Sequence, residues 1–180
     1  YASYGVTTVQ DGMVGKPLFE LLKYASANGL LKLDVVGYAD IMTAADLFEE
    51  ERAYANRYTG HLKMGGYKIF LDGSPQGRTA WMTKPYEGEE NYCGYPIHTD
   101  EELNHYIELA LEKKQQLLAH CNGDAAAEQY IGQFEKALSK RTDKDLHRAV
   151  MVHAQLVRKD QLQRMAAIGM IPSFFVAHTY

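Results

Sequence analysis

Short β-branched runs alternate with helical patterns along the whole sequence, and this alternation leaves very few possible folds. Strands are predicted at residues 6–10, 31–38, 65–71, 116–121, 148–153 and 170–175. Amphipathic helices are predicted between them, at residues 16–28, 43–56, 100–114, 124–139 and 159–168. Strands and helices in this order build a parallel sheet with right-handed crossovers, so the predicted fold class is α/β.

Two architectures accept this order of elements: an open doubly wound sheet and a (β/α)8 barrel of the TIM type. The glycine-rich fingerprints of nucleotide-binding open sheets are absent from the sequence. Polar residues instead stand at the ends of successive predicted strands: Asp11, Lys68, Asp72, His120 and His153. In a barrel those ends form one ring around a single pocket. We therefore predict a barrel, incomplete here because only six strands are counted.

The charge balance excludes some classes of partner. With 19 Lys and Arg against 23 Asp and Glu, the formal net charge is −4, which argues against binding nucleic acid or an anionic membrane through basic charge. No apolar run is long enough for a transmembrane helix. No signal peptide is visible, but the sequence starts without Met, so the compartment stays unknown. Cys93 and Cys121 form no disulfide framework or CxxC motif.

Two histidines are the strongest candidates for chemistry. His120 ends the apolar strand LLAH and His153 ends VMVH, one strand–helix unit later. Neutral imidazoles that converge on one pocket are common ligands of Zn²⁺, although a catalytic zinc normally needs three protein ligands. The other histidines up to residue 147 are expected to be exposed: His61, His98, His105 and His147. Asp124 is predicted to be a helix N-cap.

Lys68 lies inside the predicted strand YKIF, where an ammonium group loses hydration. Its side chain can point outward or reach the rim of the sheet. It can alternatively be a Schiff-base lysine with a pKa lowered by burial, or a lysine carbamylated by CO₂ that bridges two metal ions. The residues alone leave these three interpretations open.

Three segments taken together resemble the amidohydrolase superfamily. They are residues 66–74 (GYKIFLDGS), 120–126 (HCNGDAA) and 148–155 (RAVMVHAQ). The resemblance is specifically to the amidohydrolase-3 group of metal-dependent hydrolases, which includes N-substituted formamide deformylases, and it covers nearly the whole chain.

The resemblance implies a distorted (β/α)8 barrel with its metal site at the strand ends. Lys68 corresponds to the carboxylated lysine of the fourth barrel strand, and His120 and His153 to the metal-binding histidines of the fifth and sixth. It further implies one or two divalent ions, expected to be zinc, and hydrolysis of a non-peptide C–N bond, of the amide type, by metal-activated water. The family's first-strand His-x-His pair and eighth-strand Asp are absent. Residues 1–180 are therefore expected to be a single partial domain, about strands two to seven, truncated at both ends.

The long segment 73–98, rich in Gly, Pro and Tyr, has no helical or strand periodicity and is predicted to be a functional loop. It is expected to line the pocket for a small amide-type substrate, although its aromatic residues can equally pack the loop on itself. Four residues are expected to contact the substrate: Asp72, Arg78, Tyr86 and His178.

Two alternatives to a metal-dependent hydrolase remain. One is a lyase or aldolase that uses Lys68 as a Schiff base, and the other is a catalytically inactive partial barrel, which the missing ligands favour for the isolated chain. A partial barrel exposes strand edges, so a homo-oligomer formed through these edges is also expected.

Overall fold

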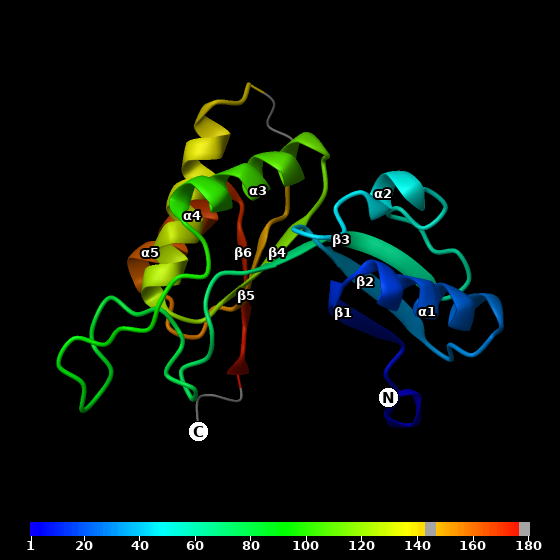
Figure 1. Ribbon diagram of the computed structural model, residues 1–180, viewed down its shortest axis with the longest axis horizontal. Helices are drawn as coiled ribbons and strands as arrows, with labels where there is room; N and C mark the ends of the chain where they lie inside the picture. Colours follow the sequence, from blue (N-terminus) through cyan, green and yellow to red (C-terminus); the bar gives the residue numbers. More distant parts are fainter. Residues whose placement is uncertain (143–146, 177–180) are drawn as a thin grey trace. The chain divides into compact units, whose positions relative to one another are not determined.

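The computed structural model of the chain describes residues 1–142 and 147–176 and divides into two compact units, Tyr1–Ile69 and Phe70–Tyr180 (Figure 1). The first unit opens with a short 3-10 helix and contains three strands and two helices. Its elements are η1 (Ala2–Tyr4), β1 (Thr8–Val14), α1 (Lys16–Ala27), β2 (Asp34–Asp40), α2 (Leu47–Glu50) and β3 (Leu62–Phe70). The strands are parallel, with β2 between β1 and β3. The predicted α/β pattern is confirmed in this unit.

The helix predicted at residues 43–56 is wrong for most of its length, because α2 contains only Leu47–Glu50. The apolar periodicity is real, since Ala44, Leu47 and Phe48 are all buried. After Glu50, however, the backbone forms hydrogen bonds with a strand and does not continue the helix. Met64 of β3 donates to the Tyr54 carbonyl at 2.9 Å and accepts from the Asn56 amide at 2.9 Å. Pairing with a strand therefore replaces the last two helical turns.

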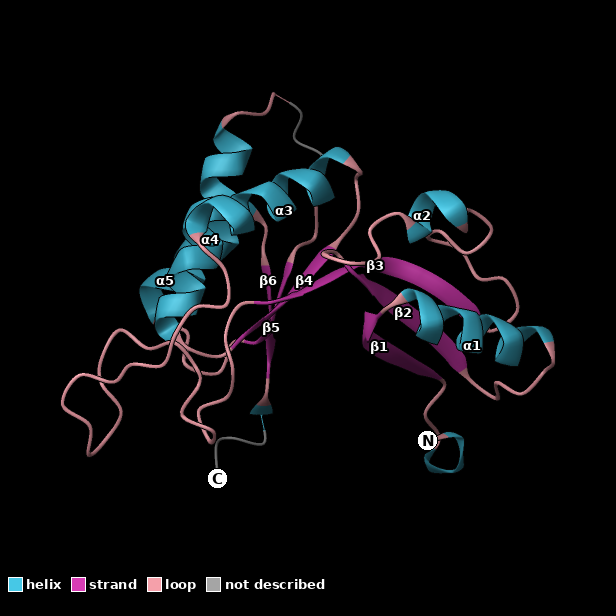
Figure 2. Ribbon diagram, in the orientation of Figure 1, coloured by secondary structure: helices cyan, strands magenta, loops and turns pink. Residues whose placement is uncertain are grey.

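The second unit alternates helices and strands in the predicted order. Its elements are α3 (Asp100–Glu112), β4 (Leu117–Cys121), α4 (Asp124–Ser139), β5 (Val150–His153), α5 (Lys159–Ile168) and β6 (Ile171–Phe174). The strands are parallel, with β5 between β4 and β6. Residues 71–99 contain no helix or strand, so the loop predicted at residues 73–98 is confirmed (Figure 2). None of the helices among the described residues is long and apolar enough to cross a membrane.

The core of the second unit lies between its helices and its strands. Tyr130 and Phe134 of α4 are fully buried, and their rings meet edge to face with centroids 5.6 Å apart. The beginning of α3 is fixed by a capping box, in which the Thr99 side chain accepts from the Glu102 amide and the Glu102 carboxylate accepts from the Thr99 amide. A buried apolar stripe and a capped end explain why the predicted helices match the observed ones closely here.

The prediction that the minor histidines are exposed is wrong for two of them. His98 is only 5% exposed, and burial lowers its pKa. His147 is half-buried, with Nε2 2.7 Å from the Ile168 carbonyl and Nδ1 accepting from the Ala149 amide at 3.0 Å. Burial lowers the pKa of His147 as well. Both imidazoles are therefore held in the neutral form by their surroundings.

We expect His147 to make the stability of the protein fall in mild acid. Its pKa is lower in the folded than in the unfolded protein, so its contribution is complete above about pH 6.5 and is lost as pH falls below that value. Urea unfolding between pH 7.5 and 5.5 should show a shallower pH dependence for His147→Gln than for the wild type. His105→Asn, at an exposed position, is the control. Equal pH dependence in wild type and His147→Gln would contradict this expectation.

Candidate functional site

The ends of β4 and β5 bring His120 and His153 together. The parallel register pairs His120 with Val152, so in a regular strand His153 would point to the opposite face of the sheet. His153 has φ 75° and Ala154 has φ 45°, which turns the chain at the end of β5. The two imidazole centroids lie 4.7 Å apart, with their planes at 76°. Positive φ at a non-glycine residue costs about 1–3 kcal/mol and is concentrated at functional sites.

The Nε2 atom of His120 faces a backbone carbonyl. It lies 2.9 Å from the Gly73 oxygen, which also accepts from the Asn122 amide side chain at 2.8 Å. The Asn122 side-chain nitrogen also lies 3.1 Å from Nε2, so this ring nitrogen faces both an acceptor, the Gly73 oxygen, and a donor, the Asn122 NH₂ group. Metal-binding histidines commonly have their other ring nitrogen held by a carbonyl or a side chain, so the ring fits the role.

Asp72 lies next to His120 and Asn122 and is 1% exposed. Its Oδ1 accepts from the Asn122 amide at 3.0 Å, and its Oδ2 accepts from the amides of Gly123 at 2.7 Å and Trp81 at 3.0 Å. Burial raises the pKa of Asp72, and the three amides and the nearby His153 oppose that rise. Its carboxylate thus joins two segments of the second unit, the loop at Trp81 and the turn at Asn122 and Gly123.

Lys68 belongs to the first unit, near the end of β3, and is 6% exposed. Its Cε lies 3.7 Å from the point where a Cβ on Gly12 of β1 would stand. The stem of the lysine therefore crosses the sheet beside β1, and the outward-pointing interpretation does not describe it. Among the described residues, 1–142 and 147–176, no three His, Cys, Asp or Glu side chains are grouped closely enough to hold a metal ion.

The long loop is anchored at its middle to the beginning of α4. The Trp81 carbonyl accepts from the amides of Ala125 at 3.2 Å and Ala126 at 3.4 Å. Gly123, and not Asp124, is the N-cap residue of α4, so the predicted capping role of Asp124 is wrong. The Asp124 carboxylate instead accepts from the amide and the hydroxyl of Thr83. A backbone carbonyl from the loop thus caps a helix whose own N-cap has no side chain.

Arg78 and Tyr86 both contact other residues of the same loop. The Arg78 guanidinium pairs with Glu89 at 2.7 Å, and the Tyr86 hydroxyl donates to the Ala80 carbonyl at 2.7 Å. The Tyr86 ring stacks on Tyr92 with centroids 5.9 Å apart. The loop is therefore packed on itself, and substrate contact by these two residues stays a prediction. His178 lies outside the described residues.

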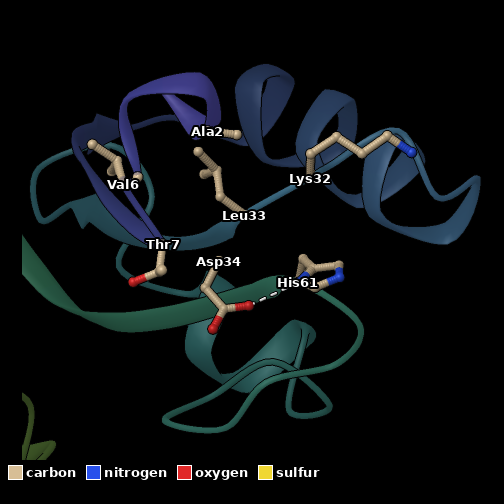
Figure 3. Close-up of a pocket in the computed structure, with 8 residues that line it drawn as sticks. Ala2, Val6, Thr7, Lys32, Leu33, Asp34 and His61 are labelled. Carbon is tan, nitrogen blue, oxygen red and sulfur yellow. Dashed lines mark hydrogen bonds and ion pairs between the residues drawn. The ribbon is translucent and has the colours of Figure 1, made fainter.

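Each unit has a cavity at the ends of its own strands, lined by described residues. One, of about 360 Å³, opens beside His153 and is lined by apolar side chains that include Leu156, Phe174 and Val176. The other, of about 370 Å³, lies in the first unit where β1 and β2 begin. Figure 3 shows Asp34 and His61 meeting there, with Oδ1 and Nδ1 2.8 Å apart. Only the first cavity adjoins a residue of the candidate metal site.

Sequence comparison finds relatives over the whole chain. The profile of a family described as the amidohydrolase family matches residues 1–180. A Bacillus subtilis protein named as an amidohydrolase, YtcJ, is 31% identical over 135 residues, which are 73% of this chain and 24% of that protein. The protein LONG AFTER FAR-RED 3 of Arabidopsis thaliana is 23% identical over 179 residues, 94% of this chain and 30% of that protein. The chain thus spans less than a third of the length of these two relatives.

Comparison with solved structures finds metal-dependent hydrolases. The crystal structure of an uncharacterized metal-dependent hydrolase from Pyrococcus horikoshii matches with a TM-score of 0.79 and 28% identity, over 96% of this chain and 34% of that one. A similar hydrolase from Pyrococcus furiosus matches with a TM-score of 0.78 and 28% identity, over 96% of this chain and 35% of that one. These similarities confirm the predicted fold class, α/β with part of a (β/α)8 barrel. The match of the family profile along all 180 residues establishes that the chain belongs to the amidohydrolase family.

Proposed function

We propose that the full-length protein is a metal-dependent hydrolase that cleaves a non-peptide C–N bond, of the amide type, by attack of activated water. The observation that carries this proposal is the pair of imidazoles at the ends of β4 and β5, 4.7 Å apart and obtained at the expense of positive φ at His153. Family membership and the similarity to metal-dependent hydrolases support it.

The chain's own residues would hold the metal through nitrogen and oxygen atoms. His120 would bind through Nδ1, since its Nε2 faces the Gly73 carbonyl at 2.9 Å, and His153 would supply the second imidazole. Lys68 would supply a third group as a carbamate, formed when its neutral amine adds to CO₂ and releases a proton. A bound divalent ion such as zinc polarises a carbonyl group and lowers the pKa of water. The apolar cavity beside His153 would exclude bulk solvent from the reacting bond.

The test uses the full-length protein, stripped with a chelator and then titrated with Zn²⁺. We expect hydrolysis of an N-substituted formamide to disappear on stripping and to return with stoichiometric metal. His120→Ala and His153→Ala should each lower kcat/KM by about 10²-fold or more. His105→Ala, exposed on α3, should leave it unchanged. Metal-independent turnover, or full activity in both strand-end variants, would refute the proposal.

The burial of Lys68 also fits the competing hypothesis of a Schiff-base lyase or aldolase, in which a buried lysine amine attacks the carbonyl carbon of the substrate. Borohydride reduction in the presence of a carbonyl substrate separates the two hypotheses. The hydrolase predicts no covalent adduct at Lys68, and the lyase predicts a stable one.

A further inference from the structure

The backbone after β5 is strained and needs support from its surroundings. His153 has φ 75° and Ala154 has φ 45°, values that residues other than glycine rarely adopt. Such a conformation persists only where the contacts around it over-determine it. We propose that Arg158 and Gln161 are positioning residues for the two imidazoles. They hold the turn after β5, residues 154–158, against the beginning of α4, and so keep the ring of His153 in place.

Backbone hydrogen bonds continue the pairing of β4 and β5 past the ends of these strands. The Ala154 amide donates to the Cys121 carbonyl at 3.1 Å, and the Leu156 amide donates to the Asn122 carbonyl at 3.0 Å. These two bonds join the first half of the turn to the segment that follows His120. Side chains join the second half of the turn to the same segment.

Gln161, in the first turn of α5, lies at the centre of these side-chain contacts and is fully buried. Its Oε1 accepts from the Arg158 amide at 2.9 Å, and its side-chain nitrogen donates to the Asp124 carbonyl at 2.8 Å and to the Glu128 carboxylate at 3.1 Å. The Arg158 guanidinium also donates to the carboxylates of Asp124 at 3.1 Å and Glu128 at 3.0 Å. One buried side chain thus joins the last residue of the turn to the first residue of α4.

A glutamine can form this link because its side chain is both a donor and an acceptor. A methionine has a similar length and volume and supplies no comparable partner, so Gln161→Met would leave the Arg158 amide and the Asp124 carbonyl unpaired. Burying polar groups without a partner is unfavourable, and these two regain partners if the turn moves away from α4 toward solvent. That movement removes the constraint on Ala154, whose φ should then return to negative values.

A change of φ at the turn moves the imidazole that precedes it. The two ring centroids, now 4.7 Å apart, should separate, and only the molecules that keep the original arrangement can present both rings to one ion. The apparent dissociation constant for that ion rises by the inverse of the fraction that keeps the arrangement. The metal part of this inference rests on the proposed function, whereas the backbone part does not.

The experiment uses the full-length protein stripped of metal. A crystal structure of Gln161→Met should show negative φ at Ala154 and imidazole centroids more than 4.7 Å apart. Chelator competition should show Zn²⁺ binding weakened by about tenfold. Arg158→Met keeps the bond from its backbone amide to Gln161 and should shift both readouts by less. Adding Ala154→Gly to Gln161→Met should recover part of the Zn²⁺ affinity, because glycine adopts positive φ as readily as negative φ.

Arg164→Met is the matched control for loss of contacts between α4 and α5. The Arg164 guanidinium pairs with Glu128 and with both oxygens of Glu135, at 2.7 and 3.0 Å, so its bonds run to the body of α4 and not to the turn. This variant should lower the free energy of unfolding without changing the φ of Ala154, the ring separation or the Zn²⁺ affinity.

The outcomes separate a positioning role from general stabilisation. If Gln161→Met does not fold, Arg158→Met decides the question. Unchanged φ and ring separation in the folded variants of these two residues would overturn the inference, as would an equal loss of Zn²⁺ affinity in Arg164→Met. Absence of Zn²⁺ binding in the wild type would count against the proposed function and leave the crystallographic test intact.

Discussion

Gly123→Ala should destabilise the protein by about 3 kcal/mol or more, although the substitution adds a single methyl group. A Cβ at this position would lie 1.8 Å from the Trp81 carbonyl oxygen and 2.5 Å from its carbon. The obstacle is backbone, and that backbone is fixed from both sides: Trp81 donates to Asp72 and accepts from Ala125 and Ala126. Relieving the overlap means losing the cap of α4 or the bond to Asp72, either of which adds to the cost of overpacking.

The matched control for this substitution lies in the same helix. A Cβ on Gly132 of α4 would meet nothing closer than the Arg164 guanidinium at 4.0 Å. Gly132→Ala should therefore stabilise the protein by about 0.5–1 kcal/mol, through the helix propensity of Ala. Urea unfolding of both variants and the wild type measures the difference. Gly123→Ala with wild-type stability would mean that the loop does not approach α4 as closely as described.

Much of this fold could be predicted from local sequence patterns. Both α4 and α5 begin and end at the predicted residues, because each carries regularly spaced apolar side chains that the fold buries, such as Phe134 and Met165. Local patterns failed where a distant segment competes for the backbone. The helix predicted at residues 43–56 is shortened because residues 54–56 pair with Met64. Nothing in the sequence of residues 43–56 predicts this pairing.

Some features of the candidate site could also be predicted from the sequence, and others could not. Strand-end position alone singled out His120 and His153, and the structure brings their rings together. The sequence offered no sign of the positive φ at His153, since glycine is the residue expected in that conformation. The links from Trp81 and Thr83 to the start of α4 were missed as well, because they join residues some forty positions apart. Asp72 was expected to contact the substrate, which stays a prediction; its burial and its three backbone N–H partners could not be foreseen from the sequence.

Lys68→Ala should lower kcat/KM of the full-length protein by about 10²-fold or more, with little loss of stability. The side chain is 6% exposed and lies beside Gly12. It is therefore buried against the sheet, where loss of hydration makes an ammonium group unfavourable. A carbamate at this position supplies two anionic oxygens. Removing it takes away a charged ligand, while truncating the stem leaves a cavity open to small solutes.

Small acids and amines added to Lys68→Ala can enter that cavity, and their effects distinguish a carbamate role of Lys68 from a Schiff-base role. If the lysine acts as a carbamate, acetate or propionate should partly restore hydrolysis in Lys68→Ala, because a carboxylate replaces the missing oxygens. Lys68→Met fills the space and should stay inactive with either acid. Lys63→Ala, on the same strand and over the Tyr58 ring at 4.7 Å, is the control and should keep wild-type activity. Restoration by ethylamine and not by acetate would show that an amine is required, and would favour the Schiff-base lyase over the hydrolase.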